Sequence, residues 1–209
     1  MRMKQTAQTT KRSAGRPRTF DREQALAIAL HLFWRHGFDG TSIPQLTTAM
    51  GISPPSLYAA FVSKEALYRE AVKLYLTQYS DFMSSLFDEK KSARDAIEQA
   101  LLAAAKQFTD PCHAPGCMIS SAELQASTDN QKLAAEIASF RKASQQIVYA
   151  RLESARKSGE LPSKTDTASL AAFFAMVTQG MSVQARDGAK AAVLKRLAKL
   201  AMQAWPRTF

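Results

Sequence analysis

Apolar residues recur at three- and four-residue intervals in almost every segment after residue 20 of this 209-residue sequence. That spacing places them on one face of a helix, and no segment shows the alternating pattern and turn signals of a β-hairpin. The sequence therefore predicts an all-α fold. The spacing, the capping residues and the glycine and proline breaks predict helices at residues 21–36, 42–50, 53–60, 64–87, 92–109, 117–127, 130–158, 166–185 and 188–204.

The positive charge of the sequence is concentrated at its start. The net charge is +10, and residues 1–20 contain six Lys and Arg side chains and no acidic one. Residues 1–19 are therefore interpreted as a basic flexible arm, which suits an anionic partner such as DNA or a membrane surface. No apolar run approaches the ~18 residues needed to span a bilayer, and the polar N-terminus lacks the apolar core of a signal peptide. We expect a soluble, cytoplasmic protein.

The stretch GISPPSLYAAF, residues 51–61, begins a short amphipathic helix with two adjacent prolines. The first N–H groups of a helix have no intrahelical partner, so proline at this position removes no internal hydrogen bond and presets φ. Ser53 is the expected N-cap, and Gly51 allows a sharp turn from the helix before it. Burial of Leu57 and Phe61 leaves an outer face that is short, small and polar enough to enter the major groove of DNA.

The longer stretch GTSIPQLTTAMGISPPSLYAAFVSKEALYREAV looks like the DNA-binding domain of the TetR/AcrR family of transcriptional repressors. The GIS turn, the LYAAF and the SKEAL fall at the family's spacing. The resemblance implies an N-terminal three-helix helix-turn-helix domain, residues 20–65, joined by a connector helix to a C-terminal helical ligand-binding and dimerisation domain, residues 66–209. Pro44 and the pair Pro54-Pro55 depart from the family's pattern and leave the base contacts open.

The same resemblance assigns DNA contacts to individual residues. Thr41 and Ser42 are expected to hold backbone phosphate at the start of the second helix, and Tyr58 to reach a phosphate or a base. Lys64 is expected to hold phosphate, and its place at a helix N-terminus, where a cation opposes the helix dipole, independently favours an external anion. The residues expected to face base edges are Ser53, Pro54, Pro55 and Ser56. Alternatives stay open: Thr41 as a helix cap, Tyr58 packed on the first helix, and Lys64 as a solvated side chain.

The basic arm is the expected source of much of the affinity for DNA. Residues 21–63 carry two arginines against three acidic residues, so the motif itself is not a basic surface. The arm contains the sequence GRPR, which resembles the core of an AT-hook, where arginines follow the negative potential of a narrow minor groove. Arg16 and Arg18 are therefore expected in the minor groove. The alternative is a disordered tail that adds only nonspecific attraction.

The last two predicted helices are rich in small and apolar residues and have more apolar surface than one partner would cover. Part of this surface is explained by an intramolecular core. The family resemblance implies that the pair, about residues 166–204, forms a two-fold four-helix dimer interface. A dimer also explains how such a protein reads a palindromic operator.

The segment DPCHAPGCMISSAEL, residues 110–124, contains both cysteines of the sequence. It resembles the helix start of family members that sense electrophiles or oxidants. Cys117 is expected at a helix N-terminus, where the dipole increases the thiolate fraction, and Cys112 is then the candidate to resolve a sulfenic acid as a disulfide. Two alternatives stay open: buried cysteine as a small hydrophobic residue, and a metal site of Cys112, His113 and Cys117 without an evident fourth ligand.

The helices between the DNA-binding motif and the last helix pair carry aromatic and methionine side chains. The resemblance implies that these helices enclose a pocket for a small-molecule inducer. Tyr79, Phe82 and Phe108 are the candidate lining residues. Plain core packing is the alternative interpretation for each of them.

The sequence lacks the motifs of an enzyme: it has no glycine-rich phosphate loop, no nucleophile elbow and no pair of carboxylates or histidines at metal-site spacing. No cofactor or resident metal is expected. The sequence predicts a homodimeric, sequence-specific repressor, released from its operator by a small molecule or by thiol modification. The alternatives are an architectural or weakly specific DNA-binding protein driven by the basic arm, and an activator built on the same motif.

Overall fold

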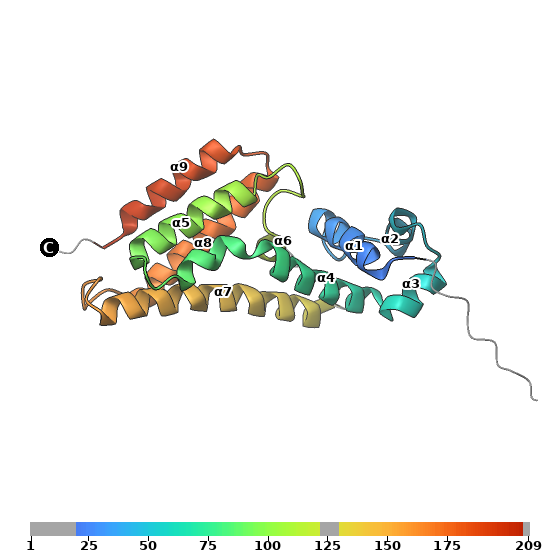
Figure 1. Cartoon of the computed structure of the whole chain (residues 1–209), viewed down its shortest axis with the longest axis horizontal. Coiled ribbons are helices and arrows are strands. Elements are labelled where there is room, and N and C mark those ends of the chain that lie inside the picture. The colour runs from blue at the N-terminus through green and yellow to red at the C-terminus, as the bar shows by residue number, and fades with distance from the viewer. Residues whose placement is uncertain (1–19, 122–129, 207–209) are drawn as a thin grey trace, which may run out of the picture.

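The structure is a computed structural model that describes residues 20–121 and 130–206. Within these ranges every regular element is helical and none is a strand, so the predicted all-α class is confirmed. Figure 1 shows an elongated molecule with α1, α2 and α3 grouped at one end and α5, α8 and α9 layered at the other, while α7 runs along it. The elements in chain order are α1 (Arg22–His36), α2 (Ile43–Met50), α3 (Pro54–Phe61), α4 (Lys64–Tyr79), η1 (Asp81–Phe87), α5 (Ala93–Gln107), α6 (Met118–Ser121), α7 (Gln131–Lys157), α8 (Thr167–Arg186), α9 (Ala191–Ala201) and η3 (Met202–Ala204).

Helices α1, α2 and α3 each begin at a residue whose side chain caps the first turn. Asp21 accepts hydrogen bonds from the backbone N–H groups of Glu23 and Gln24. Ser42 and Gln45 form a reciprocal capping box at the start of α2, and the side chain of Ser53 accepts from the N–H of Ser56 at the start of α3. These bonds satisfy donors that a helix leaves unpaired at its first turn.

The turn between α2 and α3 depends on a glycine. Gly51 adopts φ +65° and ψ +32°, the left-handed conformation that side chains with a Cβ rarely take. The turn directs α3 across the end of the molecule and turns Leu57 and Phe61 into the core, where both are fully buried. The predicted helix, glycine turn and second helix are therefore confirmed.

Arg22 fastens this three-helix unit to α4. Its guanidinium lies 4.5 Å from the ring centroid of Phe61, and its Nη2 donates at 2.8 Å to both carboxylate oxygens of Glu70 on α4. The end of α3 is thus held between the first turn of α1 and the middle of α4. The Nε of Arg22 also donates to the carbonyl of Ala60, so the one guanidinium contacts both α3 and α4.

The connector helix ends earlier than the sequence predicts. We expected it to run from Lys64 to about Phe87, but α4 ends at Tyr79 and residues 81–87 form the 3-10 helix η1. Two carbonyl groups explain the change, because the amide of Gln107 donates to the carbonyl of Tyr79 at 2.5 Å and the hydroxyl of Ser80 donates to that of Leu76. Side chains that bond the last carbonyls in this way replace the continuing helical ladder.

The remaining helices form the larger part of the molecule. Helix α5 buries mostly alanine, which lets η1 and α9 approach it closely, and α7 packs along α8. The expected bounds of these helices agree with the structure within a few residues, and α6 is described only as far as Ser121. In the described part of the chain, no helix has the length and hydropathy that crossing a membrane requires.

Candidate nucleic-acid interface and sensor site

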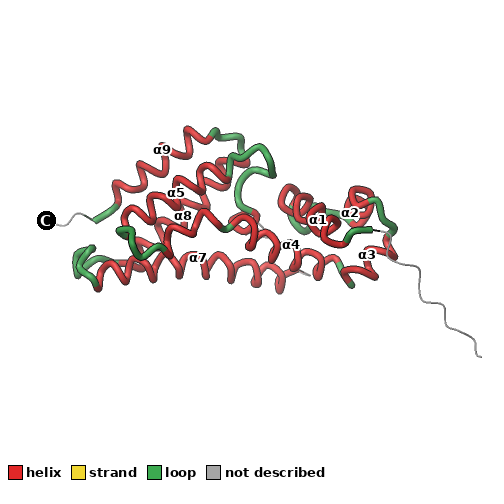
Figure 2. The backbone as a smooth tube through the Cα atoms, in the orientation of Figure 1, coloured by secondary structure: helices red, strands yellow, loops and turns green. Residues whose placement is uncertain are grey.

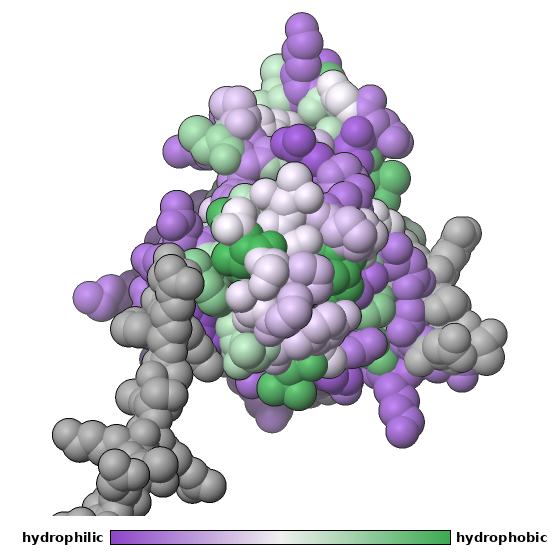
Figure 3. Space-filling model, turned by 90° about the vertical axis from the view of Figure 1, so that its right-hand side faces the viewer, coloured by the Kyte–Doolittle hydropathy of each residue, from purple (hydrophilic) through white to green (hydrophobic). Residues whose placement is uncertain are grey.

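The end of the molecule that carries α3 presents the residues expected to contact DNA. Figure 3 looks onto this end and shows pale residues of intermediate hydropathy at its centre, with hydrophobic residues in green among them and hydrophilic ones in purple farther out. Ser42, Ser53, Pro54 and Pro55 are exposed and Ser56 is half-buried. Small polar side chains on a protruding helix suit contact with base edges in a major groove. The expected contacts themselves stay predictions.

The two serines at the start of α3 bond to each other. Their hydroxyl oxygens lie 2.9 Å apart, and the Ser53 hydroxyl also accepts the backbone N–H of Ser56 at 3.3 Å. Each hydroxyl retains further hydrogen-bonding capacity, because a serine oxygen has one donor and two acceptor positions. The pair therefore fixes the first turn of α3 while leaving groups that can face DNA.

Thr41 does not occupy the position expected of a phosphate ligand. Its side chain is fully buried, its hydroxyl donates to the carbonyl of Gly37 at 2.7 Å, and its N–H donates to the carbonyl of Phe38. The residue closes the turn after α1, so the expectation of a phosphate contact from its hydroxyl is wrong for this conformation. The exposed Ser42 beside it is the residue left for that contact.

Tyr58 and Lys64 flank the same end. Tyr58 is 46% exposed, so it faces solvent and is not packed beneath α1. The Lys64 ammonium lies 4.2 Å from the ring centroid of Phe38, a cation–π contact that holds it beside the first turn of α4. Both placements are compatible with a DNA contact, which stays a prediction. Arg16 and Arg18 of the arm lie outside the described residues.

Val62 is a feature of this end that sequence reasoning missed. It adopts φ +67°, which is strained for a β-branched residue, and the N–H of Ser63 donates across it to the carbonyl of Phe61 at 2.7 Å. Its side chain is 81% exposed. No sequence signal indicates this turn, because β-branched residues such as valine rarely adopt positive φ.

Cys117, which directly precedes α6, is buried near α4. Its side chain is 5% exposed, and the hydroxyl of Tyr75 donates to its Sγ at 3.2 Å. Its backbone N–H donates to the hydroxyl of Ser182 on α8 at 2.7 Å. Burial, followed by the charge of Cys117, raises the pKa of Tyr75 well above its usual value, so Tyr75 stays a donor. The expected position at the start of a short helix is confirmed, because α6 begins at Met118.

A cluster of aromatic rings joins this thiol to the helix that enters the DNA-binding end. Trp34 on α1 is fully buried and meets Tyr75 edge to face, with ring centroids 4.8 Å apart. Trp34 also stacks on His113, with ring centroids 4.3 Å apart, and Tyr79 contacts both Trp34 and His113. From α8, the guanidinium of Arg186 donates to the carbonyl of Trp34 at 2.6 Å.

Trp34 is the central residue of this cluster, and sequence reasoning missed it. It continues the apolar face of α1 beyond Leu30 and Phe33, which is the signal that could have found it. Its indole N–H is buried and has no hydrogen-bond partner among the residues that the structure describes. The cluster spans α1, α4 and the loop between α5 and α6, a loop that Figure 2 shows returning toward α1.

A cavity of about 70 Å³ adjoins Cys117. Phe82 lies in its wall, as the sequence predicts for a pocket residue, but Phe108 and Tyr79 are not among the lining residues. Phe108 is fully buried behind Phe82, with ring centroids 5.6 Å apart, and Tyr79 belongs to the Trp34 cluster. The other lining residues are Met83, Ile119, Ser120, Arg141, Ser144, Val148, Ala175, Thr178 and Gln179.

Cys112 has different surroundings. It is exposed, its N–H donates to Oδ1 of Asp110 at 2.9 Å, and the hydrogen-bonded carboxylate of Asp110 raises the pKa of the Cys112 thiol. Both cysteines are free thiols. Among the described residues, no group of three or more His, Cys, Asp or Glu side chains is arranged to hold a metal ion, so the alternative metal site gains no support.

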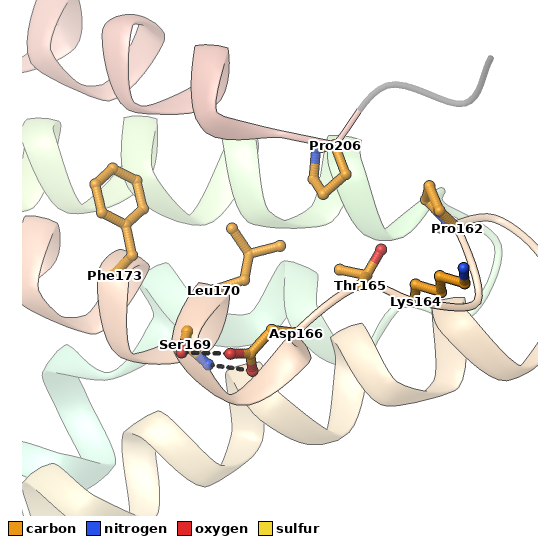
Figure 4. Close-up of a pocket in the computed structure, with 8 residues that line it drawn as sticks. All are labelled: Pro162, Lys164, Thr165, Asp166, Ser169, Leu170, Phe173 and Pro206. Carbon is orange, nitrogen blue, oxygen red and sulfur yellow. Dashed lines mark hydrogen bonds between the residues drawn. The ribbon is translucent and has the colours of Figure 1, made fainter.

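A larger cavity, about 460 Å³, lies at the other end of the molecule and is open to solvent. Figure 4 shows it between the loop that precedes α8, the first turns of α8 and Pro206. Its carboxylate, Asp166, accepts from the N–H and the hydroxyl of Ser169 at 3.0 and 2.7 Å and so caps α8. The carboxylate is therefore already occupied as the N-cap of α8. The cavity lies far from both cysteines and from α3.

Comparison with known proteins agrees with this geometry in both parts of the chain. The family model "Bacterial regulatory proteins, tetR family" matches residues 25–71, and "Tetracyclin repressor-like, C-terminal domain" matches residues 93–201. The chain is 34% identical over 202 residues to the HTH-type transcriptional repressor ComR of Escherichia coli, covering 96% of each. It is 30% identical over 178 residues to the repressor BdcR of the same organism, covering 85% of each.

The structure also resembles a solved complex. A cysteine mutant of the TetR family transcriptional regulator CifR, bound to 26 bp double-strand operator DNA, superposes with a TM-score of 0.87 at 37% identity. The match covers 92% of this chain and 100% of that one. The helix-turn-helix and the helical domain that follows it are thus both matched by family models and by these relatives. The chain belongs to the TetR family of transcriptional regulators.

Proposed function

We propose that this regulator is a homodimeric, sequence-specific transcriptional repressor that leaves its operator when Cys117 is modified or when a small molecule fills the adjoining cavity. Two relatives are named as repressors, and the regulator CifR is seen bound to operator DNA. Residues 20–65 act as the DNA-binding domain and residues 66–209 as the ligand-binding and dimerisation domain. The protein works in the cytoplasm, where its operator is.

The contacts with DNA divide into two kinds. Ser42 and Lys64 bind phosphates, while Ser53, Pro54, Pro55 and Ser56 face base edges, with Tyr58 beside them. Arg16 and Arg18 of the arm follow the minor groove. This division is supported by the end of the molecule that carries α3, where residues of intermediate hydropathy and small polar side chains suit reading of bases (Figure 3). It is also supported by the excess of positive charge in the arm, which suits phosphate contacts.

The dimer forms through α8 and α9. These helices leave large apolar side chains partly exposed: Met176, Val183, Val193, Leu197 and Leu200. Met176 is 61% exposed and Leu200 is 58% exposed. Apolar side chains on two adjacent helices are the surface that a second copy would bury in a four-helix interface. A two-fold dimer then presents two α3 helices to a palindromic operator.

The contacts between Cys117 and α1 are the observation that carries the proposed release. The hydroxyl of Tyr75 donates to the thiol, Tyr75 supports Trp34, and Trp34 belongs to the helix that holds the DNA-binding end. A group added to Sγ changes the acceptor that the Tyr75 hydroxyl bonds at 3.2 Å, even where the rest of the added group extends into the cavity. A shift of Tyr75 alters its contact with Trp34, and with it the orientation of α1 and α3.

Operator titration tests this proposal. We expect the purified protein to bind duplex from the DNA flanking its own gene at least a hundredfold more tightly than scrambled duplex at near-physiological salt. An alkylating reagent or peroxide should release the wild type and the C112S variant but leave C117S bound. Release of C117S would refute the thiol mechanism. Equal affinity for both duplexes would favour the architectural alternative, in which the basic arm supplies nonspecific binding.

Substitution of Lys64 separates phosphate contacts from base contacts. Lys64→Ala should weaken binding to every sequence and lower the slope of log K against log salt by about one, since one phosphate contact is lost. Ser56→Ala should instead alter the preference at one position of each half-site. Unchanged affinity of Lys64→Ala would show that Lys64 does not bind phosphate.

A further inference from the structure

A residue from a distant helix caps the C-terminal end of α1. The last carbonyl groups of a helix have no donor within the helix, and the carbonyl of Trp34 is one of them. It accepts a hydrogen bond at 2.6 Å from the guanidinium of Arg186, the last residue of α8. A cation at this position also meets the negative end of the helix dipole. The bond is therefore charge-assisted and stronger than one between neutral groups.

The side chain of Arg186 is held along its length. Its aliphatic stem packs against Gly116, where an added Cβ would lie 3.1 Å from Cγ of Arg186. One turn earlier on α8, the hydroxyl of Ser182 accepts the backbone N–H of Cys117 at 2.7 Å. Burial lowers the pKa of Arg186, whereas the charges of Cys117 and Tyr75 act in the opposite direction. The end of α8 thus holds both the loop before α6 and the end of α1.

A bond to Trp34 orients the DNA-binding end as a whole. Trp34 meets Tyr75 of α4 edge to face, with ring centroids 4.8 Å apart. At the other end of α1, Arg22 contacts Phe61 of α3 and bonds Glu70 of α4. Because α1, α3 and α4 contact one another in this way, a bond that fixes Trp34 against α8 also fixes the direction of α3.

Helix α8 also carries part of the surface proposed for the dimer. Met176 is 61% exposed and Val183 is 43% exposed, and Val183 lies one turn before Arg186. One continuous helix therefore joins the proposed contact with a second copy to the observed contact with α1. Since a helix is a rigid element, the arrangement of the two α8 helices in a dimer also sets the positions of the two α1 helices.

We propose that Arg186 is a positioning residue that sets the half-site spacing which the dimer accepts. It acts through Trp34 and holds each DNA-binding end at a fixed angle to α8, so that the two α3 helices of the dimer reach their half-sites together. This inference rests on the proposed dimer through α8 and α9, and it names the residue that aligns that dimer with DNA.

Two contacts from α7 also hold the DNA-binding end. Arg69 of α4 pairs with Glu136 at 2.7 Å. The amide of Asn130 donates to the carboxylate of Asp39 at 2.5 Å. The side chains of Arg69 and Glu136 are 43% and 47% exposed, so water and salt weaken their pairing. Both contacts start from α7, whereas the proposed dimer surface lies on α8 and α9, so Arg186 is the more direct link to the second copy.

The distance between the two DNA-binding ends of the dimer tests the proposal without DNA. Glu23→Cys, at an exposed position of α1, carries a nitroxide spin label in a chain that also has Cys112→Ser and Cys117→Ser, and pulsed EPR measures the distances between the two labels. Arg186→Met should broaden the distance distribution about twofold, because each end pivots once its bond to α8 is lost. Arg186→Lys, which keeps a cationic donor, should restore a narrow distribution. Arg35→Met, the same charge change in the last turn of α1, should leave it narrow.

Operator binding supplies a second readout, on the duplex that the operator titration identifies. Arg186→Met should bind this duplex about tenfold more weakly, and its preference for the duplex over one with a base pair inserted between the half-sites should fall about fivefold. A duplex with a single half-site should be bound as by the wild type, because α3 and its contacts are intact. A merely structural role would instead weaken binding to all three duplexes by the same factor, and that result would overturn the positioning role.

The remaining outcomes separate this inference from the proposed function. Absence of any distance between labels would mean that the chain is a monomer, which overturns the proposed dimer and the inference with it. A defined distance that Arg186→Met leaves as narrow as in the wild type overturns the role of Arg186 and leaves the dimeric repressor standing. An unchanged preference for the half-site spacing has the same meaning.

Discussion

Cys112 and Cys117 lie five positions apart in the sequence but in two regions with opposite chemistry. Cys112 is on an exposed loop beside Asp110, whose carboxylate keeps the thiol protonated. Cys117 is buried, receives a hydrogen bond from Tyr75, and shares its cavity with Arg141. Cys112 is thus governed by a neighbour two positions away, whereas the surroundings of Cys117 come from distant parts of the chain, Tyr75 and Ser182.

Gly116 is the residue that allows this difference, and its substitution should have the largest effect. Gly116 has φ +78°, and an added Cβ would lie 2.7 Å from the carbonyl oxygen of Ser182. Gly116→Ala should therefore lower the free energy of unfolding by about 3 kcal/mol, from backbone strain plus a clash with α8. Urea denaturation at a fixed protomer concentration measures the change.

Gly159 provides the matched control for that experiment. It has φ +82°, but an added Cβ would meet nothing within 4 Å. Gly159→Ala should therefore show the backbone strain alone, about 1 kcal/mol. Equal losses in the two variants would mean that the loop adjusts to the clash and that Cys117 is not held firmly against α8.

The hydrogen bond from Tyr75 should contribute a smaller amount. Tyr75→Phe removes the donor to Sγ of Cys117 while keeping the ring that supports Trp34. We expect a loss of about 1 kcal/mol in unfolding free energy and slower alkylation of Cys117 by iodoacetamide, with Cys112 unaffected. Faster alkylation of Cys117 would show that the hydroxyl shields the sulfur instead of activating it.

The sequence predicted features that depend on neighbouring residues. The caps at Asp21 and Ser53 follow from short polar side chains that bond donors two or three positions later, and the turn at Gly51 from its backbone freedom. Burial of Leu57 follows from helical spacing. All of these are set within one or two turns of helix, where a sequence pattern is informative.

Features set by distant contacts could not be predicted in the same way. The stop of α4 at Tyr79 depends on Gln107, which lies 28 positions later, and the place of Trp34 depends on Arg186, 152 positions away. The sequence predicts Thr41 to be a polar surface residue, but in the structure its side chain is buried in the turn after α1. Arg141 has no local signal, because nothing in its helix indicates that Ile119 and Cys117 lie beside it.

Substitution of Asp110 should have the smallest effect, a change in the alkylation rate of Cys112. Asp110→Asn removes the negative charge but keeps an oxygen that can accept the N–H of Cys112, so the turn is retained. Loss of the charge lowers the pKa of Cys112, because the carboxylate is the cause of its elevation. The thiolate of Cys112 then appears at a lower pH, and iodoacetamide should modify it about threefold faster at pH 8.

Cys117 is the internal reference in that experiment, since its rate should not change in the Asp110→Asn variant. His31, Arg35 and His36 line the cavity next to Cys112 and remain in both proteins, so their influence cancels in the comparison. If the Asp110→Asn variant and the wild type show the same Cys112 alkylation rate at every pH from 7 to 9, Asp110 does not control the thiol. Exposure alone would then account for the behaviour of Cys112, and the contrast between the two thiols would rest on the burial of Cys117.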